Sequence, residues 1–167
     1  ELWSAKILRD APELIEAVHA DHLSAGADIV TSASYQVSSQ VDLLERSVSI
    51  TRKAVDAAGK PALVAASLGP FGAHLANGSE YTGAYDADDA EIAALHRLRL
   101  AAALDCGADL VAFETVPCLR EARIIVAVLR ETPSARAWMS FSCRDDAHVT
   151  GGDRFDVCVR AALESAQ

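Results

Sequence analysis

The sequence is poor in several features that mark particular classes of protein. Aromatic residues make up only 5% of its 167 residues, and no apolar run is long enough to cross a membrane as a helix. Acidic residues outnumber basic ones by 24 to 15, which gives a net charge of −9 at pH 7. No cluster of Lys and Arg occurs. These absences argue against nucleic-acid and membrane partners and favour chemistry on small molecules.

Cysteine is also scarce, and its spacing excludes two kinds of site. The four cysteines lie far apart without a C-x-x-C pair: Cys106, Cys118, Cys143 and Cys158. Such spacing indicates neither a disulfide framework nor a local zinc knuckle. We therefore expect a reducing, cytoplasmic compartment.

The chain does contain a regular alternation of helical and strand patterns. Hydrophobic residues make up 51% of it, and with so few aromatics they predict an aliphatic α/β core in one domain over residues 1–167. Helices are predicted at residues 12–25, 41–58, 88–102, 119–129 and 155–166. Strands are predicted at residues 28–34, 62–67, 110–113 and 137–142. Alternating helices and strands require a parallel sheet with helical crossovers.

The glycine patterns narrow the choice among parallel sheets. No G-x-G-x-x-G or G-x-x-x-x-G-K-[ST] loop follows a predicted strand, which disfavours nucleotide-binding sheets and favours a (βα)8 TIM barrel. Such a barrel needs about 250 residues. The four strands and five helices predicted here supply roughly half of one, and we expect the barrel to be incomplete at both ends.

One predicted strand ends in a carboxylate. Residues 110–113 form an unbroken apolar run, typical of a strand buried on both faces, and Glu114 follows directly. In parallel α/β proteins the carboxyl ends of the strands gather binding and catalytic groups. Glu114 is therefore the first candidate site residue, and the alternative is a loop glutamate that caps the next helix.

Polar residues also follow the other predicted strands. With Glu114 and Thr115 they would ring one mouth of a barrel and suit a small polar ligand such as an amino acid; they are Thr31, Ser34, Tyr35, Gln36, Ser67, Gly69, Pro70, Ser142, Arg144 and Asp145. The segment 69–86 is long for a link between a strand and a helix and is rich in glycine and tyrosine. Long ordered loops of this kind are usually functional.

Four stretches of the chain resemble the homocysteine S-methyltransferase family: residues 26–36, 67–83, 107–117 and 138–145. The stretch 67–83 is most similar to members that use S-methylmethionine or S-adenosylmethionine. The resemblance implies a zinc-dependent TIM barrel in which the metal binds the homocysteine thiolate. That thiolate attacks a sulfonium methyl group to give methionine.

The resemblance assigns roles to particular residues. Glu114 matches a glutamate that holds the homocysteine amino group, and Tyr35 matches a tyrosine that lines the same pocket. Thr31, Ser67 and Gly69 match positions near the mouth. The alternative for Tyr35 is packing at a strand end, and for Ser67 and Thr31 it is a turn or cap role.

Two tyrosines of the long loop are candidates for the donor side of the pocket. We expect Tyr81 and Tyr85 to face the sulfonium cation through their rings. The expected partners are thus homocysteine and a sulfonium donor, with a homo-oligomer possible.

The chain departs from the family where the metal is concerned. The family's zinc cysteines come from a later strand and from a Gly-Cys-Cys stretch, neither of which this sequence contains. We therefore assign no metal ligand and no catalytic residue within the chain, and expect zinc only in the full-length enzyme. The loop between Tyr35 and Val41 is also shorter than in the family.

Two other functions are compatible with the sequence. One is a half barrel without catalytic activity that associates with itself. The other is a metal-free TIM-barrel lyase with Glu114 as its base, although no predicted strand ends in the lysine that a Schiff base requires.

Overall fold

A four-stranded parallel sheet forms the centre of the computed structural model, which describes residues 3–164. Its strands are β1 (Ile29–Thr31), β2 (Leu63–Leu68), β3 (Leu110–Val116) and β4 (Ala137–Phe141). The order across the sheet is β1-β2-β3-β4, the same as along the chain. A doubly wound sheet would reverse its direction at a switch point, whereas a barrel wall continues in one direction. The architecture is therefore a partial barrel.

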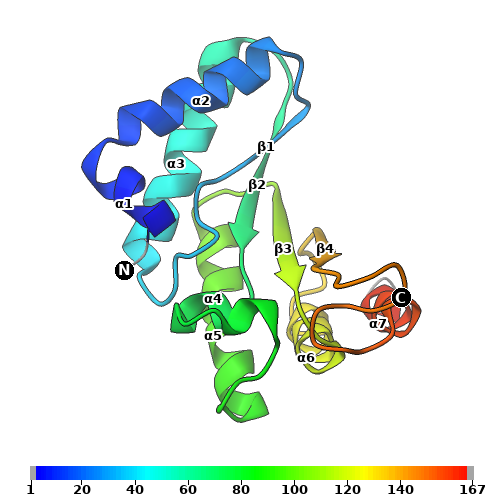
Figure 1. Ribbon diagram of the computed structural model, residues 1–167. Helices are drawn as coiled ribbons and strands as arrows, with labels where there is room; N and C mark the ends of the chain where they lie inside the picture. Colours follow the sequence, from blue (N-terminus) through cyan, green and yellow to red (C-terminus); the bar gives the residue numbers. More distant parts are fainter. Residues whose placement is uncertain (1–2, 165–167) are drawn as a thin grey trace.

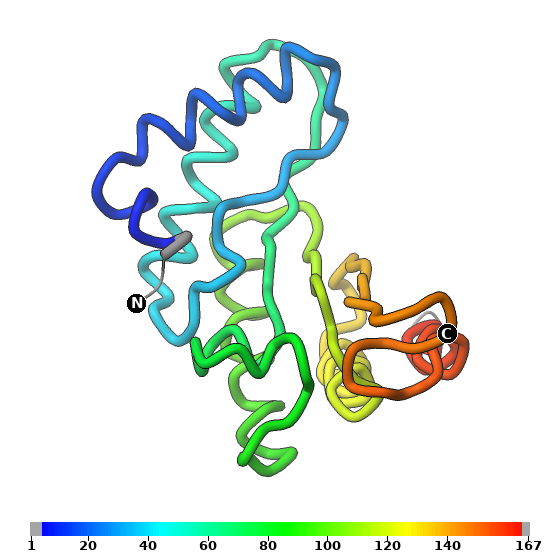
Figure 2. The backbone as a smooth tube through the Cα atoms, viewed as in Figure 1, coloured from blue at the N-terminus to red at the C-terminus, as the bar shows by residue number. Residues whose placement is uncertain are grey.

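The helices follow the same order around the strands (Figure 1). The described residues form α1 (Trp3–Asp10), α2 (Pro12–Ser24), α3 (Val41–Ala58), α4 (Phe71–Leu75), the 3-10 helix η1 (Ser79–Tyr81), α5 (Asp89–Asp105), α6 (Leu119–Arg130) and α7 (Phe155–Leu163). The crossover helices pack in sequence, α2 on α3, α3 on α5, α5 on α6 and α6 on α7. In Figure 2 the α1–α2 segment (blue) and α7 (red) lie at opposite ends of the molecule, as do the outer strands β1 and β4 in the order of the sheet.

The core lies along the two central strands. Val64, Ala65 and Ala66 of β2 and Val111 and Phe113 of β3 are completely buried. The outer strands are more exposed, since Ile29 of β1 retains 42% of its accessible surface. No helix among residues 3–164 has both the length and the apolar character that crossing a bilayer requires.

The predicted alternation of strands and helices is confirmed, with two helices that the sequence patterns do not reveal. The first is α1, which ends at Asp10, a residue type that often caps the start of a helix such as the one that follows. The N-cap of α2 is instead Ala11, which makes no side-chain capping bond. The second is α4, a short helix inside the long loop that follows β2.

The buried face of α2 also differs from the predicted one. The spacing of Leu14 and Val18 marks them as core residues, yet they are 54% and 52% exposed. Ile15, His19 and Leu23 are buried instead. Alanines and histidines in this helix make two adjacent faces similar in hydropathy, and contact with α3 selects the face that carries His19, whose Nε2 lies 3.1 Å from Thr51 Oγ1.

Candidate active site

A β-bulge near the end of β3 presents Glu114 and Thr115. The pairing of β3 with β4 shifts register between Phe113 and Val116, and Thr115 has a left-handed φ of 61°. That backbone region is strained for a β-branched residue, and such strain concentrates at functional sites. The Thr115 hydroxyl donates to the Glu114 carbonyl oxygen at 2.5 Å. The bulge thus directs Glu114 away from the regular strand alternation.

Side chains from three strand ends meet at this bulge. The Ser67 hydroxyl donates to Glu114 Oε2 at 2.5 Å, and the Tyr35 hydroxyl lies 2.6 Å from Thr115 Oγ1. Gly69 N donates to the Tyr35 carbonyl oxygen at 3.1 Å. A Cβ atom on Gly69 would lie only 2.6 Å from that oxygen, so glycine is required there. We call Tyr35, Ser67, Gly69, Glu114 and Thr115 the strand-end cluster.

A set of serine hydroxyls carries the chain from β1 to Tyr35. The predicted strand over residues 28–34 is regular only over Ile29–Thr31, because serine side chains then replace backbone pairing. Ser32 Oγ accepts from Ser67 N at 3.1 Å, and Ser34 Oγ donates to the Ser67 carbonyl oxygen at 2.8 Å. Ser34 is completely buried. These bonds turn the chain so that Tyr35 reaches the end of β3.

Thr31 is not brought into the strand-end cluster. It lies on the outer strand β1 and is exposed, in a surface groove of about 350 Å³ that His19 and His22 also line.

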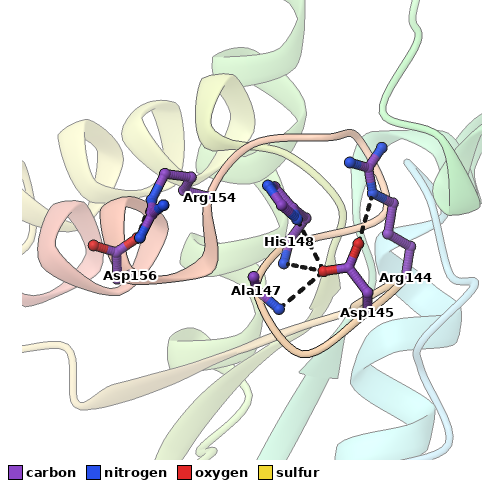
Figure 3. A network of polar contacts seen from close by, with 6 residues as sticks. All are labelled: Arg144, Asp145, Ala147, His148, Arg154 and Asp156. Atoms are coloured by element: carbon purple, nitrogen blue, oxygen red, sulfur yellow. Dashed lines mark hydrogen bonds and ion pairs between the residues drawn. The ribbon is translucent and has the colours of Figure 1, made fainter.

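The loop after β4 holds Arg144 and Asp145 in a local network of their own (Figure 3). Asp145 Oδ1 accepts from Ala147 N at 2.9 Å and from His148 N at 2.8 Å. These backbone bonds, with those from the side chains of His148 and Arg144, hold the pKa of Asp145 at about 2. Ser142 is the residue of this loop that reaches β3, since its hydroxyl donates to the Thr115 carbonyl oxygen at 3.3 Å.

The strand-end cluster lies in a negative electrostatic environment. Burial raises the pKa of Tyr35 despite its hydrogen bond with Thr115, and the charges of Glu80 and Glu114 raise it further. The Tyr35 hydroxyl is therefore neutral at physiological pH. Two carboxylates close to one neutral phenol make this end of the sheet suitable for a cationic ligand.

A second group of polar side chains lies beneath the cluster, buried between α5 and α6. Arg99, His96 and Glu121 are each at most 1% exposed. Arg99 Nη2 donates to the Gly69 carbonyl oxygen at 2.8 Å and to His96 Nδ1 at 3.1 Å. His96 Nε2 in turn donates to Glu121 Oε1 at 2.8 Å. We call these three residues the buried polar triad.

The charges of the buried polar triad balance. Burial lowers the pKa of His96, so its ring is neutral, and burial lowers the pKa of Arg99 only to about 10, so it stays charged. Burial opposes the charge of Glu121, but hydrogen bonds from His96, Tyr85 and Phe71 N outweigh it and lower its pKa. A neutral imidazole thus bridges one cation and one anion.

The two tyrosines predicted on the donor side occupy different surroundings. Tyr81 is 63% exposed. Tyr85 donates its hydroxyl to Glu121 Oε2 at 2.7 Å and places its ring 5.5 Å from that of Phe71. Burial and the charge of Glu121 raise its pKa. Tyr85 is therefore tied to the buried polar triad, and its hydroxyl does not face the strand-end cluster.

Thr115 is among the strand-end residues expected from the sequence, whereas sequence patterns do not reveal Glu80 or the buried polar triad as parts of this region. The sequence contains one indication of the buried polar triad, because His96 and Arg99 fall on the same apolar stripe of α5 as Ile92 and Leu95. A charged residue on a buried stripe predicts a partner elsewhere in the core.

The cysteines do not form a metal site in the described part of the chain. All four are free, and residues 3–164 contain no group of three or more Cys, His, Asp or Glu side chains able to hold a metal ion. Burial raises the pKa of Cys158 to about 11, so its thiol stays protonated. The residues present do not fit a catalytic zinc, which needs about three protein ligands.

The fold defines a class, that of TIM-barrel proteins, of which this chain forms a partial barrel with acidic side chains at the carboxyl ends of its strands. Comparison with known proteins gives the family. The homocysteine S-methyltransferase family matches residues 1–167, and the chain belongs to that family.

Individual relatives agree with this assignment. The chain is 44% identical to homocysteine S-methyltransferase YbgG of Bacillus subtilis over 90% of its own length and 55% of that protein. It is 43% identical to the homocysteine S-methyltransferase of Escherichia coli, covering 90% of this chain and 54% of the relative. The chain thus spans about half the length of these relatives.

A solved structure is similar throughout. The crystal structure of the metallated form of the homocysteine methyltransferase MmuM from Escherichia coli superimposes with a TM-score of 0.91 at 40% sequence identity. The similarity covers 98% of this chain and 63% of MmuM.

Proposed function

We propose that the full-length protein carrying this chain transfers a methyl group from a sulfonium donor, S-methylmethionine or S-adenosylmethionine, to homocysteine to form methionine. In this reaction the donor's S–CH3 bond breaks and a new S–CH3 bond forms on homocysteine. The electron pair of the old bond stays with the donor sulfur, which becomes a neutral thioether, and the thiol proton is released.

The observation that carries this proposal is the placement of Glu114 in a member of the homocysteine S-methyltransferase family. The bulge of β3 and the Ser67 hydroxyl hold its carboxylate at the strand end. A fixed carboxylate there can accept hydrogen bonds from the ammonium group of an amino acid. We assign Glu114 to the homocysteine amino group, with Tyr35, Ser67 and Gly69 forming the wall beside it.

Two further features of the proposal concern the rest of the protein. A zinc ion, if the full-length enzyme holds one, takes its ligands from outside residues 3–164, so no chemical step is assigned to it here. The four free cysteines support a reducing, cytoplasmic location.

The proposal is tested by assaying methionine formation from homocysteine with each sulfonium donor, using the full-length protein. Glu114→Ala should weaken homocysteine binding by roughly 1.5–3 kcal/mol, the value of a charged hydrogen bond, as measured by titration calorimetry. Glu13→Ala, at an exposed position of α2, is the matched control. Unchanged homocysteine affinity in folded Glu114→Ala protein would contradict the assignment.

A further inference from the structure

Glu80 is a buried side chain with one carboxylate oxygen that no described residue pairs with. It lies in η1, is 8% exposed, and its Oε2 atom has no hydrogen-bond partner among residues 3–164. An ionised group taken out of water without a partner is costly, and an unsatisfied group in a native structure needs an explanation. The hydroxyl of the neighbouring Ser79 is likewise buried without a hydrogen-bond partner among residues 3–164, so both side chains lack a partner there. The missing partner of Glu80 is therefore best sought in a ligand.

The loop that carries Glu80 bridges the ends of β2 and β3. On the β2 side, a Cβ atom on Gly72 would overlap the Glu80 backbone nitrogen, so α4 and η1 touch. On the β3 side, a Cβ atom on Gly83 would lie 2.9 Å from Cys118 Cβ, in the link between β3 and α6. Figure 1 shows this loop and α4 beyond the end of β2. Glu80 is thus held over the end of the sheet that carries Glu114.

The same loop places Glu80 close to Tyr35. Tyr35 packs against Gly69, at the start of the loop, and its pKa responds to the charges of both Glu80 and Glu114. Two carboxylates therefore flank one tyrosine. The nearby cation Arg99 bonds to the Gly69 carbonyl oxygen and His96, and its charge is balanced by Glu121.

We propose that Glu80 is the counter-charge for the sulfonium of the methyl donor and so determines specificity for a cationic donor. This inference rests on the proposed function, in which Glu114 takes the homocysteine ammonium group and leaves the second carboxylate for the second cation. A sulfonium has no N–H or O–H group to donate, so it pairs with a carboxylate chiefly by charge, and burial strengthens that attraction.

The chemistry of methyl transfer predicts which kinetic constant changes when Glu80 is replaced. The positive charge of the sulfonium diminishes as the methyl group leaves, so Glu80 stabilises the bound donor at least as much as the transition state. Loss of such an interaction raises the Michaelis constant for the donor without lowering kcat. Glu80 also binds the neutral thioether product less well than the donor, which favours product release.

The test compares Glu80→Gln with wild type and with Glu13→Gln in the full-length protein. In Glu80→Gln the Michaelis constant for S-methylmethionine should be about tenfold higher or more. Its kcat and its Michaelis constant for homocysteine should stay within twofold of the wild-type values. Calorimetry should show the same loss of affinity for S-methylmethionine and a change of less than twofold for methionine, which has the same α-amino acid group without the sulfonium charge. Removing an unpaired buried charge should leave the melting temperature unchanged or higher.

Each contrary result has a distinct meaning. Equal losses for methionine and S-methylmethionine, or a lowered melting temperature, would overturn the pairing of Glu80 with the sulfonium. Unchanged constants in Glu80→Gln beside an active wild type would overturn it and leave the proposed function standing. A wild-type protein without sulfonium-dependent methyl transfer would overturn both.

Discussion

Replacing Glu121 with leucine should destabilise the protein far more than replacing it with glutamine. Glu121 is completely buried. Its Oε1 atom accepts from Phe71 N at 2.6 Å and from His96 Nε2 at 2.8 Å, and Oε2 accepts from the Tyr85 hydroxyl at 2.7 Å. The carboxylate thus joins α4, α5 and the loop that carries Tyr85 to α6, and it balances the charge of Arg99.

The magnitude follows from what each variant preserves. Both variants remove the charge that balances Arg99, and an uncompensated buried charge costs about 3–5 kcal/mol. Leucine also removes the acceptors of all three hydrogen bonds, and each buried donor left unsatisfied costs about 1–3 kcal/mol more. Glutamine retains one oxygen for the two N–H donors, and the Tyr85 hydroxyl can rotate to accept from the new amide. We therefore expect about 3–5 kcal/mol for Glu121→Gln and a clearly larger cost for Glu121→Leu, although such terms are not strictly additive.

Urea unfolding of the full-length protein measures the loss of unfolding free energy in each variant. The dependence of that free energy on urea concentration should be the same in all variants for the comparison to hold. A third variant, Arg99→Met with Glu121→Leu, removes the cation as well and should be less destabilised than Glu121→Leu alone, because no unpaired charge remains. Equal costs for glutamine and leucine would refute the hydrogen-bond argument. A double variant no more stable than Glu121→Leu would refute the charge balance.

Two further predictions concern the loop and the histidines. Gly72→Ala should lower stability by about 1–3 kcal/mol, since the new methyl group overlaps the Glu80 backbone; an unchanged melting temperature would show that α4 and η1 separate freely. The free energy of unfolding should fall as pH drops from about 6.5 to 5, because burial lowers the pKa of His19 and His96 and the unfolded state therefore binds more protons in that window. Melting curves at each pH check this, and His19→Gln should reduce the slope.

Periodic patterns predict this fold well because burial repeats along each element. The run at residues 110–113 identified a covered strand, and the alternation of elements required a parallel sheet, as observed. The helix predicted from residue 88 begins at that point, since Asp88 is the N-cap of α5 and makes reciprocal bonds with Glu91. Such features depend on neighbours within four residues, and the sequence displays them directly.

Contacts between residues far apart in the sequence were harder to predict. The pairing of Glu121 with His96 and the bond from Arg99 to Gly69 join segments at least 25 residues apart. The apolar stripe of α5 indicates that His96 and Arg99 face the core, but it does not identify the residues that they contact. Only the packing of α5 against α6 shows that Glu121 is buried with them and pairs with His96.

The bulge of β3 shows why the position of Glu114 could be predicted and its geometry could not. In a regular strand Phe113 and Thr115 would share one face, and Glu114 and Val116 the other. Phe113 and Val116 are instead both buried and pair with Met139 and Phe141, two residues apart on β4. Three steps on β3 therefore match two on β4, and the extra residue allows both apolar side chains to enter the core while Glu114 and Thr115 are released together to the strand end. A pattern of period two contains no sign of this extra residue, because the bulge is determined by the register of β4.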